Sequence, residues 1–248
     1  PPAPPPPPTP QETPPPPPGA TPAPAAEGPI DNTVPEHLVT LKPFELCRYP
    51  VSQKLWQEVM GESPKHLKFQ NPHRPVERIS WMMITNAFFT ALNQKTGDNN
   101  YCLPSEAQWE YVGKGASQGK ILIKSNLFEY SGSNDFREVS WASENSFGES
   151  HPLGLKRPNS LGLADMSGNI WEWCVDWYSR NYYQTLNRQY GEKGSSNPQG
   201  PKEGDFRVVR GGSWSFHSDH SYITFRNYNH PQSKYSRVGF RLCRNASP

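Results

Sequence analysis

Two imidazoles and a carboxylate stand close together in the sequence, in a pattern that could bind zinc. In His217-Ser218-Asp219-His220 the two histidines are three positions apart and flank an aspartate, and imidazole and carboxylate are both zinc ligands. Histidines that bind a metal usually stand on a regular element, with partners that orient the ring. The surrounding residues have neither a helical nor a strand period. We therefore interpret this group as chance proximity in a loop.

Two further arrangements could be mistaken for a catalytic centre. Glu106 and Glu110 are one turn apart on a predicted helix, where paired carboxylates could act as general acid and base. Their place in a helix start favours capping and bracing of loops instead. Ser213 could be a nucleophile, but the sequence around it has no elbow motif and no orienting group. The sequence therefore predicts no catalytic residue.

The composition divides the chain of 248 residues at about residue 30. Residues 1–30 contain 16 of the 29 prolines and none of the 30 aromatic residues. Such a segment cannot bury enough apolar surface to fold, and its proline runs favour extended polyproline II. We predict a proline-rich disordered stalk over 1–30 and one domain over 31–248. A linker without a spacing role is the alternative.

Charge and hydropathy limit the partners of the domain. The formal net charge is +2, with scattered Lys and Arg, so the sequence predicts no nucleic-acid partner. No apolar run approaches the roughly 18–20 residues that span a bilayer, and we expect no membrane contact by the domain itself. Because the chain begins without Met, we expect a lipidated anchor upstream of Pro1. That anchor would place the protein at the cell surface or elsewhere outside the cytoplasm.

The four cysteines form no CxxC pair, which argues against zinc-ribbon and thioredoxin-like sites. We predict that all four are free or structural. A pair between Cys102 and Cys243 is conceivable, because each stands at the end of a predicted strand.

Periodicity and capping signals predict an α+β domain rich in loops. Ser105 and Gln108 form a capping box that starts one helix. Helices are expected at 80–94, from 105 onward, and at 53–60; strands are expected at 170–177, 206–210 and 238–242. In 170–177 tryptophans alternate with polar residues, which predicts a strand with one buried face.

Five segments in order resemble the formylglycine-generating enzyme (sulfatase-modifying factor) family. They are PVERISW at 75–81, LPSEAQWEY at 103–111, GLADMSGNIWEW at 162–173, RGGSW at 210–214 and GFRL at 239–242. The resemblance implies a C-type lectin fold of the formylglycine-generating enzyme type. That fold is loop-rich and has a small twisted antiparallel sheet with two main helices.

The activity implied by this resemblance is oxidation of a sulfatase cysteine to formylglycine by copper held on two thiolates. The two cysteine positions of the family correspond here to Ser218 and Ile223, and neither side chain binds copper(I) as a soft thiolate does. We therefore expect a non-catalytic domain that requires no cofactor. A copper oxidase or related enzyme with displaced ligands is the alternative.

The resemblance also implies a possible structural calcium ion at the GNxWEW turn. Its ligands would be Ser167, Gly168, Ile170 and Glu172, which offer carbonyl oxygens and one carboxylate. In the alternative, Glu172 hydrogen-bonds to loop amides.

Residues 215–237 have the composition of a contact surface, because Tyr and Phe give large apolar area while Ser, Asn and His adapt their hydrogen bonds. Only Gln232 and Lys234 in this segment cannot be encoded by a codon ending in C or T. Together with the scaffold, this resembles the variable proteins of diversity-generating retroelements. The resemblance implies a variable ligand-binding segment for an unidentified protein or surface ligand, in which Arg226 and Pro231 are fixed. The implied binding residues are Ser215, Phe216, His217, Asp219, His220, Phe225, Asn227, Tyr228, Asn229, His230, Ser233, Tyr235 and Ser236. A solvated loop on a purely structural domain is the alternative.

Overall fold

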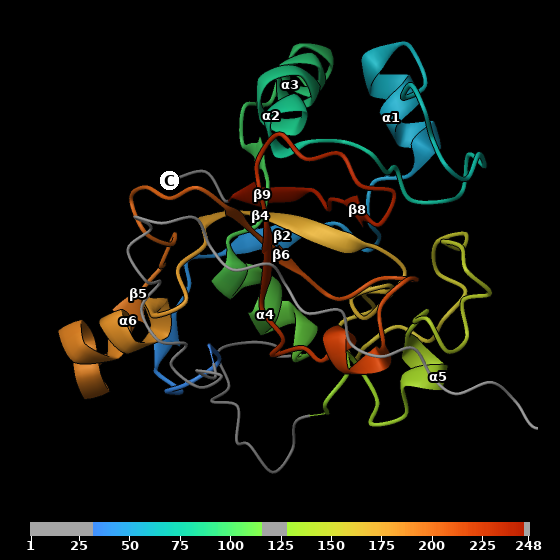
Figure 1. The fold of residues 1–248 in the computed structure, drawn as a ribbon. Helices are drawn as coiled ribbons and strands as arrows, with labels where there is room; N and C mark the ends of the chain where they lie inside the picture. The colour runs from blue at the N-terminus through green and yellow to red at the C-terminus, as the bar shows by residue number, and fades with distance from the viewer. Residues whose placement is uncertain (1–31, 116–127, 246–248) are drawn as a thin grey trace, which may run out of the picture. The chain divides into compact units, whose positions relative to one another are not determined.

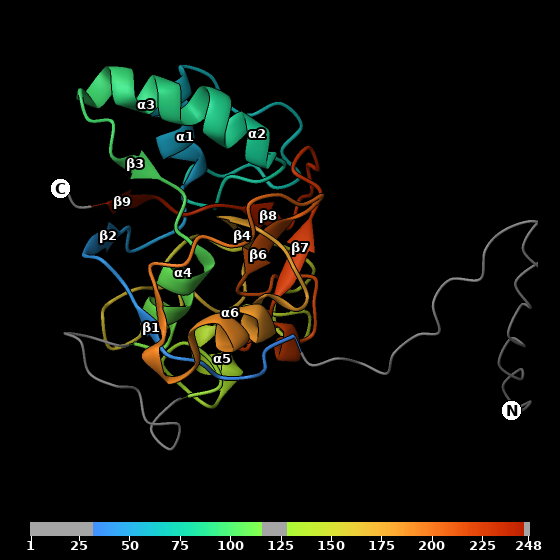
Figure 2. The ribbon, with the colours of Figure 1, turned by 90° about the vertical axis from the view of Figure 1, so that its left-hand side faces the viewer.

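The computed structural model describes residues 32–115 and 128–245, and the stalk predicted at 1–30 lies outside these ranges. Helices flank small sheets on two sides, with α1, α2 and α3 above them and α4 below in both views (Figures 1 and 2). The helices are α1 (Gln53–Met60), α2 (Trp81–Met83), α3 (Phe89–Thr96), α4 (Glu106–Gly113), α5 (Phe136–Val139) and α6 (Tyr182–Tyr190). The strands are β1 (Val39–Thr40), β2 (Phe44–Leu46), β3 (Tyr101–Cys102), β4 (Trp171–Trp177), β5 (Ser195–Ser196), β6 (Arg207–Arg210), β7 (Asn227–Asn229), β8 (Val238–Gly239) and β9 (Cys243–Asn245).

The three predicted helices are present, and local capping explains their limits. Ser52 accepts a hydrogen bond from the Leu55 amide at the start of α1, and Gly61 ends that helix with a φ of 79°. At α4, the Ser105 side chain and the Gln108 side chain satisfy each other's backbone amides, as the capping box predicts. The predicted 80–94 helix extends to Thr96 and contains one π-helical stretch between α2 and α3.

The α+β class and the loop-rich architecture are confirmed, but the largest sheet is mixed rather than purely antiparallel. The largest sheet has the strand order β7-β6-β4-β8. β6 runs antiparallel to β4 and β7, whereas β8 is parallel to β4. The predicted 238–242 strand ends at Gly239, because the chain then passes to a second sheet of order β2-β9-β3.

The expectation that β4 buries only one face is wrong. Trp171 and Trp173 are buried as expected, but the alternating Glu172, Cys174 and Asp176 are buried too. Hydrophobic residues from α1, α3 and β8 pack on the tryptophan side, while α4 covers the other. On that side Glu172 pairs with Arg241 and Asp176 accepts a hydrogen bond from the Glu106 amide, so protein groups take the place of water around both carboxyl groups.

Cys102 on β3 and Cys243 on β9 are opposite each other in the antiparallel register, and all four cysteines are free. The hydrogen bond from Cys243 lowers the pKa of the Cys102 thiol, although burial opposes this shift. A mild two-electron oxidant such as oxidised glutathione should join the two sulfurs, with loss of both thiol hydrogens. We expect this bond to raise the unfolding free energy by about 2 kcal/mol.

Intact mass, thiol titration and urea unfolding before and after oxidation check this prediction. Cys102→Ser should abolish the effect, whereas Cys47→Ser should preserve it. Oxidation that leaves both thiols titratable would contradict it.

Within 32–115 and 128–245, no helix is both long and apolar enough to cross a bilayer.

Candidate functional site

The segment 215–237 connects β6 to β8 and contains a short 3-10 helix at Ser218–Ser221 followed by β7. Its buried residues are Ser218, Ser221, Ile223 and Arg226, and none of these belongs to the thirteen proposed binding residues. Of the thirteen, six are exposed and seven are half-buried. The exposed ones are Ser215, His217, Asp219, Tyr228, His230 and Tyr235; the half-buried ones are Phe216, His220, Phe225, Asn227, Asn229, Ser233 and Ser236. We call these thirteen residues the contact face.

Arg210, at the end of β6, holds the backbone beneath the contact face. Its side chain is fully buried, and its guanidinium donates to three consecutive carbonyl oxygens. The distances are 2.7 Å to Ile223, 3.1 Å to Thr224 and 2.5 Å to Phe225. Because these are main-chain acceptors, the contacts do not depend on which side chains the segment carries.

Other residues outside the segment hold its main chain in the same way. The Trp214 indole donates to the Ser236 carbonyl at 3.1 Å, and the Ser167 hydroxyl donates to the Ser221 carbonyl at 2.9 Å. Backbone amides do so as well. The pairs are Ser143 to Phe216 (2.8 Å), Arg78 to Tyr235 (3.0 Å) and Trp171 to Arg237 (2.9 Å).

Arg210 belongs to a buried network of ion pairs that also includes Arg226. The Glu110 carboxylate lies 2.7 Å from Arg210; burial raises the pKa of Glu110, but the Lys114 and Arg210 charges outweigh this and lower it to about 2. Arg226, predicted to be a fixed position, is buried and pairs with both Glu106 oxygens at 2.7 Å. Glu106 and Glu110 thus brace the scaffold, which is the role that the helix-start motif favoured.

Aromatic rings form two groups on the contact face. His220 contacts both Phe216 and Phe225, and the two phenylalanines lie against the buried Trp171. Tyr228 is 43% exposed and stacks on Tyr178, with ring centroids 4.3 Å apart. Tyr228 also contacts Phe206, and Phe206 contacts His230.

The second group extends beyond the segment, because Tyr178 and Phe206 belong to neighbouring parts of the sheet. Neither residue was among the predicted binding residues. Tyr178 directly follows β4 and Phe206 directly precedes β6, and both strands belong to the sheet that contains β7. The sequence alone does not show how these strands pair, so it could not place the two rings beside Tyr228.

His217 contacts two carboxylates, one of which the sequence did not indicate. Its imidazole nitrogens lie 3.1 Å from Glu144 and 3.2 Å from Asp219. Partial burial raises the pKa of Glu144, but hydrogen bonds from Ser218 dominate and lower it to about 2. Among the residues that the structure describes, no three His, Cys, Asp or Glu side chains are arranged to hold a metal ion. The group therefore orients the 217–219 turn.

The carboxylate suggested as a calcium ligand pairs with a cation of the protein in this arrangement. Both Glu172 oxygens face the buried Arg241 guanidinium at 2.8 and 3.0 Å. The Trp109 indole donates to the same carboxylate at 2.8 Å. The Ser167 hydroxyl is engaged with the segment, as described above, and Gly168 and Ile170 are buried in the turn. A guanidinium already supplies the positive charge that calcium would bring.

Ser218 and Ile223, the positions at which the resemblance places the family's cysteines, are both buried. The Ser218 amide donates to Glu144 at 3.0 Å, and Ile223 packs in an apolar cluster with Trp109 and Cys174. Burial raises the pKa of the Cys174 thiol well above its usual range. This environment opposes formation of a copper-binding thiolate.

Comparisons with known proteins agree with this architecture. Residues 16–246 match the sulfatase-modifying factor enzyme 1-like domain (FGE-sulfatase). The chain is 31% identical over 224 residues to the chaperone protein LppX of Paenibacillus barcinonensis, covering 71% of each. It is 31% identical to the formylglycine-generating enzyme of Streptomyces coelicolor, covering 71% of this chain but 54% of that enzyme.

Among solved structures, Treponema denticola variable protein 1 superposes with a TM-score of 0.70 at 26% identity. The match covers 85% of this chain and 87% of that one. The five sequence motifs, the fold and these matches agree, and the chain belongs to the sulfatase-modifying factor enzyme 1-like domain family.

Proposed function

We propose that this domain is a non-catalytic ligand-binding protein that presents the contact face on a static scaffold. The observation that carries the proposal is the way in which the segment is held. Scaffold side chains and amides bind its carbonyl oxygens, from Phe216 to Arg237. A backbone fixed in this way tolerates different side chains, as a diversified binding segment requires. The likeness to a protein named as variable supports the same conclusion.

The proposal includes display outside the cytoplasm, with the contact face binding a protein or another surface ligand. In this proposal the proline-rich residues 1–30 would serve as the spacer between the domain and its anchor. Binding would depend on a few exposed aromatic anchors, such as Tyr228 and Tyr235.

The scaffold should tolerate simultaneous change of the contact face. Replacing His217, Asp219, Tyr228, His230 and Tyr235 together with Ser should cost less unfolding free energy than Ile223→Ala alone. The five side chains are exposed and contribute about 1–2 kcal/mol in all, whereas Ile223 is 2% exposed and its truncation leaves a cavity worth about 3 kcal/mol.

Urea unfolding of the two variants and the wild type gives the comparison. The reverse ranking would mean that the contact-face side chains contribute substantially to the unfolding free energy, and that the scaffold does not fold independently of them.

Binding itself can be tested with two displayed libraries of the intact chain. One library varies the thirteen contact-face residues, using codons that end in C or T. The other varies an equal number of exposed residues between 180 and 205. Selection on immobilised lysozyme should give specific binders from the first library only. Equal recovery from both libraries, or none from the first, would refute a specialised binding face.

A formylglycine-generating oxidase is the second candidate, because the match to the Streptomyces coelicolor enzyme favours it. It would need copper ligands other than Ser218 and Ile223. Copper(I) uptake by the purified chain, followed by turnover of a cysteine-containing sulfatase peptide, would support the oxidase and contradict the binding-protein proposal.

A further inference from the structure

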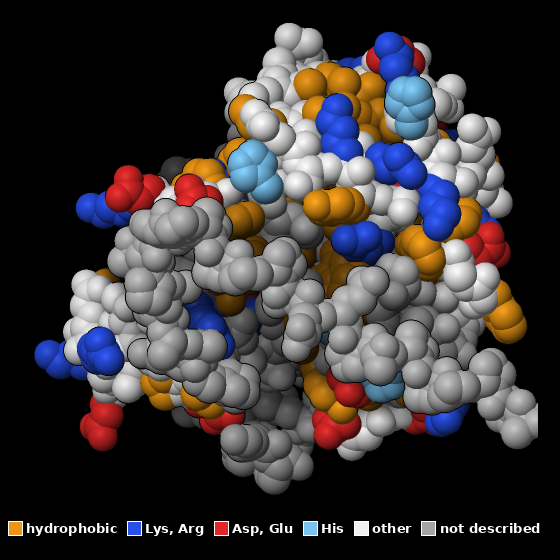
Figure 3. Space-filling model, viewed as in Figure 1, with side chains coloured by type: hydrophobic (Ala, Val, Ile, Leu, Met, Phe, Trp, Pro, Cys, Tyr) orange, Lys and Arg blue, Asp and Glu red, His pale blue; other side chains and the backbone are white. Residues whose placement is uncertain are grey.

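A cavity of about 450 Å³ lies between α1 and α2, outside the contact face. Trp56 and Met60 of α1, Met83 of α2 and Ile79 supply its apolar lining. In the space-filling view, exposed hydrophobic side chains lie between the positions of α1 and α2, bordered by Lys, Arg and His (Figure 3). The volume falls in the range of small-molecule sites.

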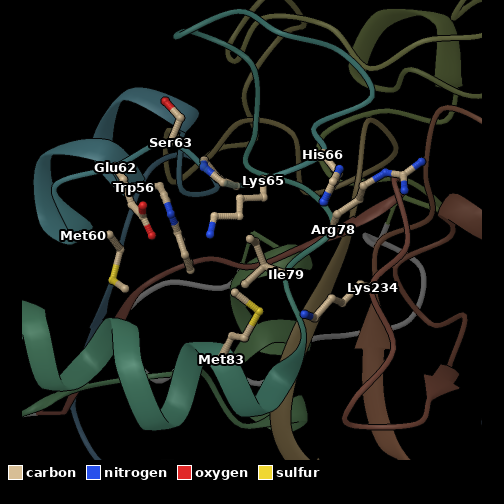
Figure 4. Close-up of a pocket in the computed structure, with 11 residues that line it drawn as sticks. Trp56, Met60, Glu62, Ser63, Lys65, His66, Arg78, Ile79, Met83 and Lys234 are labelled. Atoms are coloured by element: carbon tan, nitrogen blue, oxygen red, sulfur yellow. The ribbon is translucent and has the colours of Figure 1, made fainter.

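Two lysines bring positive charge to this apolar cavity. Lys65 and Lys234 reach in from different parts of the chain, and their amino groups point toward Ile79 and Met83 (Figure 4). In the described ranges neither lysine takes part in an ion pair within 4.0 Å. Glu62 is the one carboxylate in the lining, and the Arg78 guanidinium points away from the cavity (Figure 4).

Buried side chains fix the loop that forms one wall. The Glu77 carboxylate is fully buried and accepts hydrogen bonds from the Lys68 and Phe69 amides. The Gln53 side chain donates to the Phe69 carbonyl at 2.7 Å and accepts from the Asn71 amide at 3.0 Å. The exposed segment that carries Lys65 is therefore tied to the scaffold at its C-terminal end, beginning at Lys68.

The opposite wall is fixed through main-chain contacts. The Arg78 amide donates to the Tyr235 carbonyl at 3.0 Å, and the Met82 amide donates to the Pro231 carbonyl at 3.3 Å. These two contacts flank Lys234. This lysine is also one of the two residues in 215–237 that no codon ending in C or T encodes. The cavity is thus lined by residues outside the contact face.

From this geometry we infer that the cavity binds a small anionic amphiphile, with its apolar body against the half-buried Met60 and Met83 and its anionic group between Lys65 and Lys234. A cation would meet two ammonium groups, and a fully polar anion would leave the Met60 and Met83 thioethers without an apolar partner. This inference does not depend on ligand binding by the contact face, because the two sites share no residue.

Octyl sulfate and octyltrimethylammonium, used below micelle-forming concentrations, provide probes with the same chain and opposite charge. Isothermal titration of the intact chain should show octyl sulfate binding about tenfold more tightly. In the double variant Lys65→Glu with Lys234→Glu, the preference should disappear or reverse. Lys202→Glu, on an exposed residue outside the cavity, changes charge without touching the site and should leave both affinities unchanged.

A second variant tests the apolar part without altering charge. Met83→Gln keeps nearly the same shape but places an amide in the lining, and should weaken octyl sulfate about tenfold. Thermal unfolding of each variant establishes that it is folded. Equal affinity for the two probes, or octyl sulfate binding that survives the double inversion, would overturn the inference.

Discussion

Replacing Arg241 with Met should cost the domain about 3–5 kcal/mol of unfolding free energy, because it leaves a buried carboxylate without its partner. Arg241 is fully buried. Its guanidinium binds both Glu172 oxygens and also donates to the carbonyls of Cys47, Arg48 and Ala164 at 2.7–2.9 Å. Methionine fills similar space but satisfies none of these acceptors. The loss is a large share of a typical domain's stability.

A matched control and a compensating variant make this result interpretable. Arg137 forms a surface ion pair with Asp135, and its side chain is 73% exposed; Arg137→Met should cost less than about 0.5 kcal/mol. Adding Glu172→Met to Arg241→Met should recover part of the loss, since the unpaired charge is removed. Urea unfolding measures all four proteins. A cost for Arg241→Met no larger than that of the control would show that the buried pair contributes nothing.

Replacing Asp176 with Asn should stabilise the domain increasingly as the pH rises. Asp176 is 2% exposed, and burial, reinforced by the nearby Glu106 charge, raises its pKa to about 8. An aspartate in the unfolded chain ionises near pH 3.9. Below that pH both states hold the proton. Between about pH 4 and 8 only the unfolded state releases it, so the wild type loses stability with rising pH.

The asparagine variant has no such titration and can still accept the Glu106 amide hydrogen bond that Asp176 accepts at 2.8 Å. Each unit of pKa difference corresponds to about 1.4 kcal/mol, so the advantage of the variant should reach several kcal/mol at pH 8. Urea unfolding from pH 4.5 to 8.5 measures it, with Asp205→Asn as an exposed control. An advantage that does not change with pH would contradict this account of Asp176.

Local signals in the sequence were sufficient for the helices that begin or end with strong caps. Ser105 with Gln108, and Gly61, act on neighbouring backbone groups, so their effect is visible without the fold. α6 was not predicted. It follows Asn181, which makes no side-chain capping hydrogen bond, and it buries only Leu186, so no capping signal marks its start.

Long-range partners decided what the sequence could not predict. The alternation in β4 indicated a solvated face, but Arg241, Arg226 and α4 come from distant parts of the chain and cover it. The contact face was identified by composition and resemblance. The hydrogen bonds from Arg210 to the carbonyl oxygens of the segment depend on how the chain folds. No pattern in the sequence indicates them. The cavity between α1 and α2 went unpredicted for the same reason.

The position of β7 limits which sequences the segment can adopt without harm to solubility. β7 is the outer strand of its sheet, so one of its edges has no strand partner in that sheet. On β7 the Tyr228 amide donates instead to the Asn227 side chain at 2.8 Å. Variants with Val or Ile at 227 and 229 would make that edge flatter and more apolar, and such edges recruit other chains into aggregates. Asn at both positions, with Pro231 two residues after the strand, protects against this. Under the proposed function, diversification of this segment would be constrained by self-association as well as by folding.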